Sequence, residues 1–120
     1  MTIDIPGADV KKGLDIDDDD IGVYVKILSS YVKHTPALLE KLKVISDETM
    51  TTYIAAVHTI KGSSGSIGAD EIKKTAMELE ALAKAGDIAG VKALNGKLVQ
   101  STETLLSNIQ AWLKKNGGAG

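Results

Sequence analysis

The sequence predicts an all-α fold, an antiparallel up-down four-helix bundle with a short N-terminal lead-in. Apolar residues recur three and four positions apart over most of the chain, which is the period of an amphipathic helix. No segment alternates apolar and polar residues as a half-buried strand does. With no phenylalanine and only 3% aromatic residues, the core must be built from aliphatic side chains. We therefore expect a lead-in at 1–14, a helical bundle at 15–116 and a flexible glycine tail at 117–120.

The first half of the chain predicts an extended lead-in followed by an interrupted amphipathic helix. Residues 1–14 are expected to be mostly extended, with a turn at Pro6-Gly7 and one helical turn within 8–14. An apolar stripe then runs from Ile21 to Val32 at helical spacing. Thr35-Pro36 looks like a cap followed by a proline at the first helical position, so we expect the helix to break or kink there.

A cluster of aspartates, Asp15 and Asp17–Asp20, precedes that stripe. A calcium loop needs glycine at its sixth place and glutamate at its twelfth, and neither reading frame supplies both. Carboxylates are favoured at a helix N-terminus, where they accept hydrogen bonds from free amides and oppose the helix dipole. We therefore predict a helix start here and no metal site.

The second half of the chain predicts three helices separated by glycines. A helix over residues 49–66 ends before Gly68, a helix over 70–84 ends at Gly86, and Asp87 caps a last helix of roughly 28 residues. The last two helices have apolar stripes that suit an antiparallel bundle. Their members are Ile72, Ala76, Leu79 and Ala83, then Val91, Leu94, Leu98, Leu105, Ile109 and Trp112.

His58 is the candidate functional residue because no bulky side chain shares its face of the helix. Its neighbours three and four positions away are Ala55, Lys61 and Gly62, with Gly65 one turn further on. Glycine inside a helix costs about 1 kcal/mol relative to alanine, so these glycines indicate that something approaches the ring closely. Neutral imidazole is a nucleophile near pH 7. Lys61 would place a positive charge beside any anion on that ring.

The run that begins at His58 resembles the signature of histidine-containing phosphotransfer (HPt) domains. That signature is roughly His-x-x-Lys-Gly followed after five residues by Gly, and its places are taken by His58, Lys61, Gly62 and Gly68. The resemblance extends over about residues 15–115. It implies a phosphorelay intermediate, a phosphotransfer protein rather than a stand-alone enzyme.

Under this resemblance, a receiver domain of a response regulator or hybrid histidine kinase docks over His58 and transfers its aspartyl phosphate to the ring. Lys61 would neutralise the phosphoryl oxygens. The receiver would bring its own Mg²⁺, and the chain itself would need no cofactor or metal. The face that the receiver approaches would be formed by Ala55, Gly62, Ser63 and Gly65.

The resemblance also assigns a role to Glu80. In several members of the family an acidic or amide side chain on the following helix accepts a hydrogen bond from Nδ1 of the histidine, which leaves Nε2 free to attack. Counting along the matched segment places that role on Glu80. It would lie beside the core stripe, on a line with Lys73, Met77 and Lys84, and a solvated surface glutamate is the alternative.

Several function classes are disfavoured by composition. The chain has no cysteine, and all 14 basic residues are lysines in a chain of net charge −2, so neither a thiolate site nor reading of guanine by arginine is available. No apolar run approaches the roughly 18 residues of a membrane span, and no signal peptide or kinase signature is present. We expect a cytoplasmic monomer without nucleic-acid binding, membrane insertion or ATP-dependent kinase activity of its own.

Two other interpretations stay open from the sequence. The chain could be the phosphate-accepting domain of a chemotaxis-type histidine kinase, phosphorylated in trans by an ATP-bound kinase domain. It could also be a helical interaction module that keeps the bundle without the chemistry. The second histidine, His34, lies beside the predicted helix break and is expected on the surface.

Overall fold

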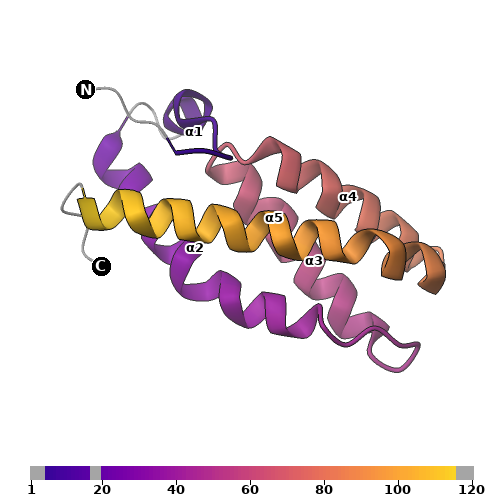
Figure 1. Ribbon diagram of the computed structural model, residues 1–120. Coiled ribbons are helices and arrows are strands. Elements are labelled where there is room, and N and C mark those ends of the chain that lie inside the picture. Colours follow the sequence, from indigo (N-terminus) through magenta and orange to yellow (C-terminus); the bar gives the residue numbers. More distant parts are fainter. Residues whose placement is uncertain (1–4, 17–19, 116–120) are drawn as a thin grey trace.

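Helices make up most of the residues that this computed structural model describes, which are 5–16 and 20–115 (Figure 1). The all-α prediction is confirmed: in these ranges there is no strand, and only an isolated bridge joins Ile5 to Ala8. The predicted tail, 117–120, lies outside the described residues. The helices are α1 Val10–Ile16, α2 Ile21–Lys41, α3 Met50–Ser66, α4 Asp70–Lys84 and α5 Ile88–Lys115.

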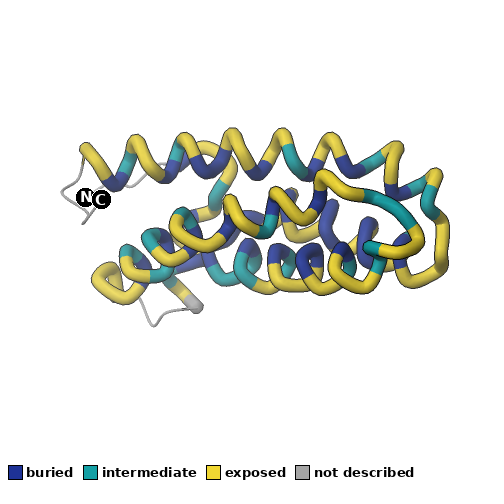
Figure 2. The backbone as a smooth tube through the Cα atoms, turned by 90° about the horizontal axis from the view of Figure 1, so that it is seen from below, coloured by how far each residue is buried: buried dark blue, intermediate teal, exposed yellow. Residues whose placement is uncertain are grey.

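The four longer helices form a ring in which each packs against its two neighbours. α3 packs on α2 and most extensively on α4, and α5 closes the ring against α4 and α2 (Figure 1). The links 67–69 and 85–87 are too short for anything but antiparallel neighbours. On each helix the buried positions recur along one side and the exposed positions along the other (Figure 2). This is the bundle that the apolar stripes predicted.

Most of the predicted core positions are buried, although Ile21 at the start of α2 is exposed. The inward stripe of α4 is buried along its whole length, and in α5 only Leu94 and Trp112 are partly exposed while packing against the core. One buried polar link crosses this core: the Tyr53 hydroxyl donates to Asn95 Oδ1 at 2.7 Å, and Asn95 Nδ2 donates to the Leu42 carbonyl at 3.0 Å. Burial raises the pKa of Tyr53 to about 12, so its hydroxyl stays a donor.

Side-chain caps set two of the helix starts. Asp20 is the N-cap of α2, and its Oδ1 accepts from the Val23 amide at 3.2 Å, as predicted for the aspartate cluster. Asp15, which the same prediction placed at a helix start, lies in the last turn of α1, Val10–Ile16, and Asp17–Asp19 lie outside the described residues. Asp87 caps α5 in the same way, because its Oδ1 accepts from the Gly90 amide at 2.9 Å.

Of the break or kink predicted at Thr35-Pro36, the break is wrong, and the kink stays a prediction. α2 continues through Pro36 to Lys41 as one helix. Proline removes one helical hydrogen bond, but Thr35 and Leu39 on the same helix are buried in the bundle. Their packing holds the helix together across the proline, and a local sequence pattern does not contain this information.

The N-terminal segment is part of the packed structure. The turn predicted at Pro6-Gly7 is present, and the helical turn predicted within 8–14 belongs to a longer helix, α1, which ends at Ile16. Ile5 is only 1% exposed. The Asp9 amide donates to the Gly68 carbonyl at 2.8 Å, and Lys12 forms an ion pair with Asp70 at 2.9 Å. The segment therefore covers the turn between α3 and α4.

Gly68 is required at that turn for two reasons. Its φ of +80° lies in the left-handed region, and a Cβ there would collide with the backbone carbonyl of Asp9. Gly86 has a similar φ of +75° but nothing within 4 Å of its Cβ position. A side chain at position 86 would therefore meet only the strain of the left-handed backbone, without a collision.

We expect Gly68→Ala to lower the free energy of unfolding by about 2–4 kcal/mol, since it adds a steric collision to backbone strain. Gly86→Ala should cost only about 1–2 kcal/mol, because strain acts there alone. Urea-induced unfolding of both variants followed by circular dichroism measures the difference. Equal losses in the two variants would contradict the close approach of Asp9.

Candidate functional site

The site lies on the antiparallel contact between α3 and α4. Two cross-helix contacts set the register: His58 lies against Glu80, and Gly65 lies against Lys73. Residue numbers rise along α3 while they fall along α4, so the helices run in opposite directions. The pair formed by His58 and Glu80 therefore lies at the middle of α3 and about one turn before the end of α4.

His58 is held at one ring nitrogen and open at the other. Its side chain is 64% exposed, and Nδ1 lies 2.7 Å from Glu80 Oε2. An ionised carboxylate can only accept hydrogen bonds, so the proton of the neutral ring belongs on Nδ1. Nε2 then keeps its lone pair on the exposed part of the ring. This arrangement suits a nucleophile with a fixed orientation.

Glu80 is a buried carboxylate with three cationic or donating partners. Its side chain is only 8% exposed, and Lys61 Nζ lies 2.6 Å from Oε1. Lys84 Nζ lies 3.5 Å from Oε2, the oxygen that also contacts His58. The hydrogen bond from Lys61, then that from His58 and the charges of both lysines, lower the pKa of Glu80 to about 2, although burial acts in the opposite direction. The carboxylate is therefore ionised throughout the physiological pH range.

Glu80 is more deeply buried than its predicted place beside the core stripe of α4 suggested. It lies on the expected line of α4, whose members Lys73, Met77 and Lys84 are exposed, yet Glu80 itself is buried and is not a solvated surface residue. The reason is that His58 and Lys61 on α3 reach across and cover it. Burial here depends on the neighbouring helix, which the periodicity of α4 does not describe.

Lys61 forms an ion pair with Glu80. Its side chain is 27% exposed, and its ammonium makes a short charge-assisted hydrogen bond to the carboxylate. The predicted role of Lys61 in neutralising a phosphoryl group stays a prediction. Sequence reasoning placed Lys84 beside Glu80 but gave it no role. The signal that could have found it is the spacing of four residues from Glu80, which puts two helical side chains in contact.

The small residues around His58 fall into two groups. Ala55 and Gly62 are exposed, and nothing lies within 4 Å of a Cβ placed on Gly62. Ser63 and Gly65 are half-buried, and Ser63, which was expected on the same face as His58, lines the groove between α3 and α2. A Cβ on Gly65 would lie 3.2 Å from the side chain of Lys73, so the small size of Gly65 also serves helix packing. Gly62 is the position at which only access from outside explains a glycine.

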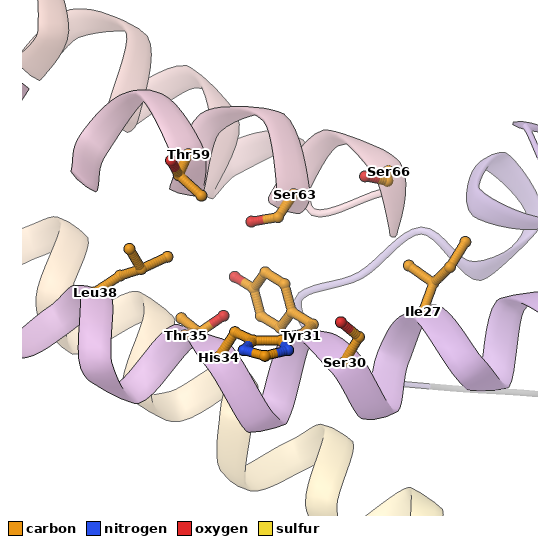
Figure 3. Close-up of a pocket in the computed structure, with 9 residues that line it drawn as sticks. All are labelled: Ile27, Ser30, Tyr31, His34, Thr35, Leu38, Thr59, Ser63 and Ser66. Carbon is orange, nitrogen blue, oxygen red and sulfur yellow. The ribbon is translucent and has the colours of Figure 1, made fainter. Parts of the chain in front are cut away.

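On its other side α3 forms a groove with α2, of about 380 Å³ (Figure 3). Hydroxyl groups face into it, but those of Thr59, Ser63 and Ser66 each bond a carbonyl of α3 itself. His34 borders the groove from α2 and is exposed. Its lining residues are Ile27, Ser30, Tyr31, His34, Thr35, Leu38, Thr59, Ser63 and Ser66.

The part of the chain that the structure describes holds no group of three or more His, Cys, Asp or Glu side chains that could bind a metal ion. Within the same ranges, no helix is both long and apolar enough to cross a membrane.

The structure defines a helical-bundle protein with an exposed histidine whose imidazole contacts a buried carboxylate on the next helix. A sequence model of the Hpt domain matches residues 26–112, which is more than half of the chain. The chain belongs to the Hpt domain family, whose members transfer phosphoryl groups through a histidine in two-component signalling. No curated protein and no solved structure matches the chain.

The ion pairs of Glu80 predict a pH-dependent contribution to stability. The pKa of the carboxyl group is about 2 in the folded chain against an ordinary 4.5, so its stabilisation is fully present above about pH 5 and is lost as the pH falls towards 2. We expect Glu80→Gln to lower the free energy of unfolding at pH 7 by about 1–2 kcal/mol, since it leaves the half-buried Lys61 without a counter-charge. This difference should shrink between pH 5 and pH 2.

Urea unfolding of wild type and Glu80→Gln across that pH range measures the effect. The control is Glu78→Gln, which removes an exposed carboxylate from the same helix and should show no such trend. A difference between wild type and Glu80→Gln that is constant with pH would contradict the contacts described for Glu80.

Proposed function

We propose that the protein is a phosphorelay intermediate whose phospho-accepting nucleophile is Nε2 of His58. The observation that carries this proposal is the 2.7 Å contact between His58 Nδ1 and the buried Glu80 carboxylate. A surface histidine without a partner can rotate and hold its proton on either nitrogen. Here one nitrogen is bound, so the lone pair is kept on the nitrogen that an incoming group can reach.

The phosphoryl donor in this proposal is an aspartyl phosphate on a receiver domain. The lone pair of Nε2 attacks phosphorus in line and forms an N–P bond, while the acyl O–P bond breaks and its electron pair returns to the receiver carboxylate. The Nδ1 proton stays on the ring, which becomes positively charged. Glu80 opposes that charge from 2.7 Å away. Transfer to a second receiver reverses the same steps.

The partners proposed are receiver domains of response regulators or hybrid histidine kinases. The receiver brings the Mg²⁺ that helps to neutralise the phosphoryl oxygens, and this chain adds positive charge without a cofactor of its own. We propose that it acts in the cytoplasm as a monomer. A monomer is in keeping with the apolar stripes of its four long helices, which are buried against one another.

The first test is transfer from a receiver domain that carries a radiolabelled aspartyl phosphate. We expect wild type to gain an acid-labile, alkali-stable label and His58→Gln to gain none, because the nucleophile is gone. His34→Gln is the matched control, since it replaces an exposed histidine on a neighbouring helix, and it should be labelled like wild type. Wild type left unlabelled by a broad panel of receivers would contradict the proposal and favour a domain phosphorylated in trans by a kinase, or an inert interaction module.

A second test concerns access to His58. We expect Gly62→Gln to fold as wild type, because nothing lies within 4 Å of its Cβ position, but to slow transfer from a receiver by about 100-fold, since the longer side chain crowds the incoming partner. Gly96→Gln on α5 is the matched control, as Gly96 is also exposed with open space at its Cβ position. Single-turnover kinetics measure the transfer rates of wild type, Gly62→Gln and Gly96→Gln. Unimpaired transfer by Gly62→Gln would defeat the steric explanation.

A further inference from the structure

Two ammonium groups flank the pair formed by His58 and Glu80, and they are bound very differently. Lys61 lies 2.6 Å from Glu80 Oε1 with a side chain 27% exposed. Lys84 lies 3.5 Å from Oε2 with a side chain 62% exposed. The first distance is that of a strong charge-assisted hydrogen bond, and the second exceeds the usual hydrogen-bond range. Lys61 is fixed, while Lys84 loses little if it moves away from Glu80.

The two lysines lie on opposite sides of the pair. Lys61 is one helical turn beyond His58 on α3, and Lys84 is one turn beyond Glu80 on α4. Because α3 and α4 are antiparallel, these two turns lead in opposite directions along the contact. Lys84 is also the lysine that lies near Glu80 Oε2, the carboxylate oxygen that His58 Nδ1 contacts, whereas Lys61 bonds the other oxygen.

We propose that Lys84 is the residue that neutralises the phosphoryl group on His58, and that Lys61 instead holds Glu80 in place. This inference rests on the phosphotransfer function proposed above. A lysine is a flexible point charge, so an exposed one next to the ring can turn from Glu80 to the phosphoryl oxygens. Lys61 would have to break its short bond to a buried carboxylate to do the same.

The local charges favour these separate roles for Lys84 and Lys61. Two lysines and one carboxylate leave one positive charge unmatched when the ring is neutral. Phosphorylation adds about two negative charges to the site. Lys84 can then change partners without leaving Glu80 unpaired, because Lys61 and the charged ring still contact the carboxylate. The competing explanation is that Lys84 and Glu80 form an ordinary surface pair four residues apart, with no part in phosphate binding.

The test uses potassium phosphoramidate as donor, so that no receiver is needed. Nε2 attacks phosphorus, the P–N bond of the donor breaks, and ammonia leaves. The pKa of the phosphoryl group on His58 is then measured by ³¹P NMR in wild type, Lys84→Gln, Lys84→Arg, Lys61→Gln and Lys74→Gln. Lys74 is the matched control, since it is an exposed lysine of the same helix, ten residues away. Circular dichroism checks that each variant is folded.

A positive charge beside the phosphoryl group lowers its pKa, so we expect Lys84→Gln to raise that pKa by about 0.5. Lys84→Arg and Lys74→Gln should match wild type, and Lys61→Gln should raise the pKa less than Lys84→Gln does. A purely structural role for Lys84 would not move this pKa. High salt should reduce the difference, because the lysine is exposed.

Other results overturn the inference in distinguishable ways. If Lys84→Gln matches Lys74→Gln, or if Lys61→Gln has the larger effect, the role of Lys84 is wrong while phosphotransfer through His58 stands. If wild type accepts no phosphoryl group from phosphoramidate or from any receiver, the proposed function fails and this inference fails with it.

Discussion

The site depends on one buried negative charge, the carboxylate of Glu80. A carboxylate with a side chain only 8% exposed needs counter-charges, and it obtains them from Lys61, His58 and Lys84. Two of these partners belong to α3 and one to α4, so the carboxylate also fixes the register of the two helices. The same interaction that makes this burial possible orients the imidazole. Replacing Glu80 would therefore disturb both the packing of α3 on α4 and the orientation of His58.

The other contacts of α3 keep its functional face turned outward. Each of the three tyrosines of the chain links α3 or its C-cap to another helix. Tyr24 of α2 donates to the Ile67 carbonyl, Tyr31 of α2 forms a hydrogen bond with Ser64, and Tyr53 of α3 donates to Asn95 on α5, which lies across the bundle from α3. Small side chains would let α3 rotate or slide, because they offer little to interlock. Buried polar bonds are directional, so they fix the rotation that apolar packing leaves loose.

The N-terminal segment adds a further constraint at the end of the α3–α4 pair. Asp9 binds the backbone of Gly68, and Lys12 pairs with Asp70 at the start of α4. The turn between the two helices is thus held from outside as well as by its own glycine. Since His58 and Glu80 come from these two helices, a fixed turn helps to keep the 2.7 Å contact in place. A segment remote from the ring in sequence therefore supports its orientation.

The sequence by itself determined the helices that have strong local start and stop signals, and it singled out His58 as the candidate nucleophile. Gly68, Gly86 and the cap at Asp87 predicted where α4 and α5 begin and end. The small residues beside His58 distinguished it from an ordinary surface histidine. Both signals are local, because capping residues and side chains on one helical face act within one or two turns. Only the tertiary structure decided that α2 continues through Pro36, that Glu80 is buried, and that Lys61 lies closer to Glu80 and is less exposed than Lys84. Those outcomes depend on which helix covers a given side chain. Helical periodicity gives a direction for each residue but not the neighbour that it meets there.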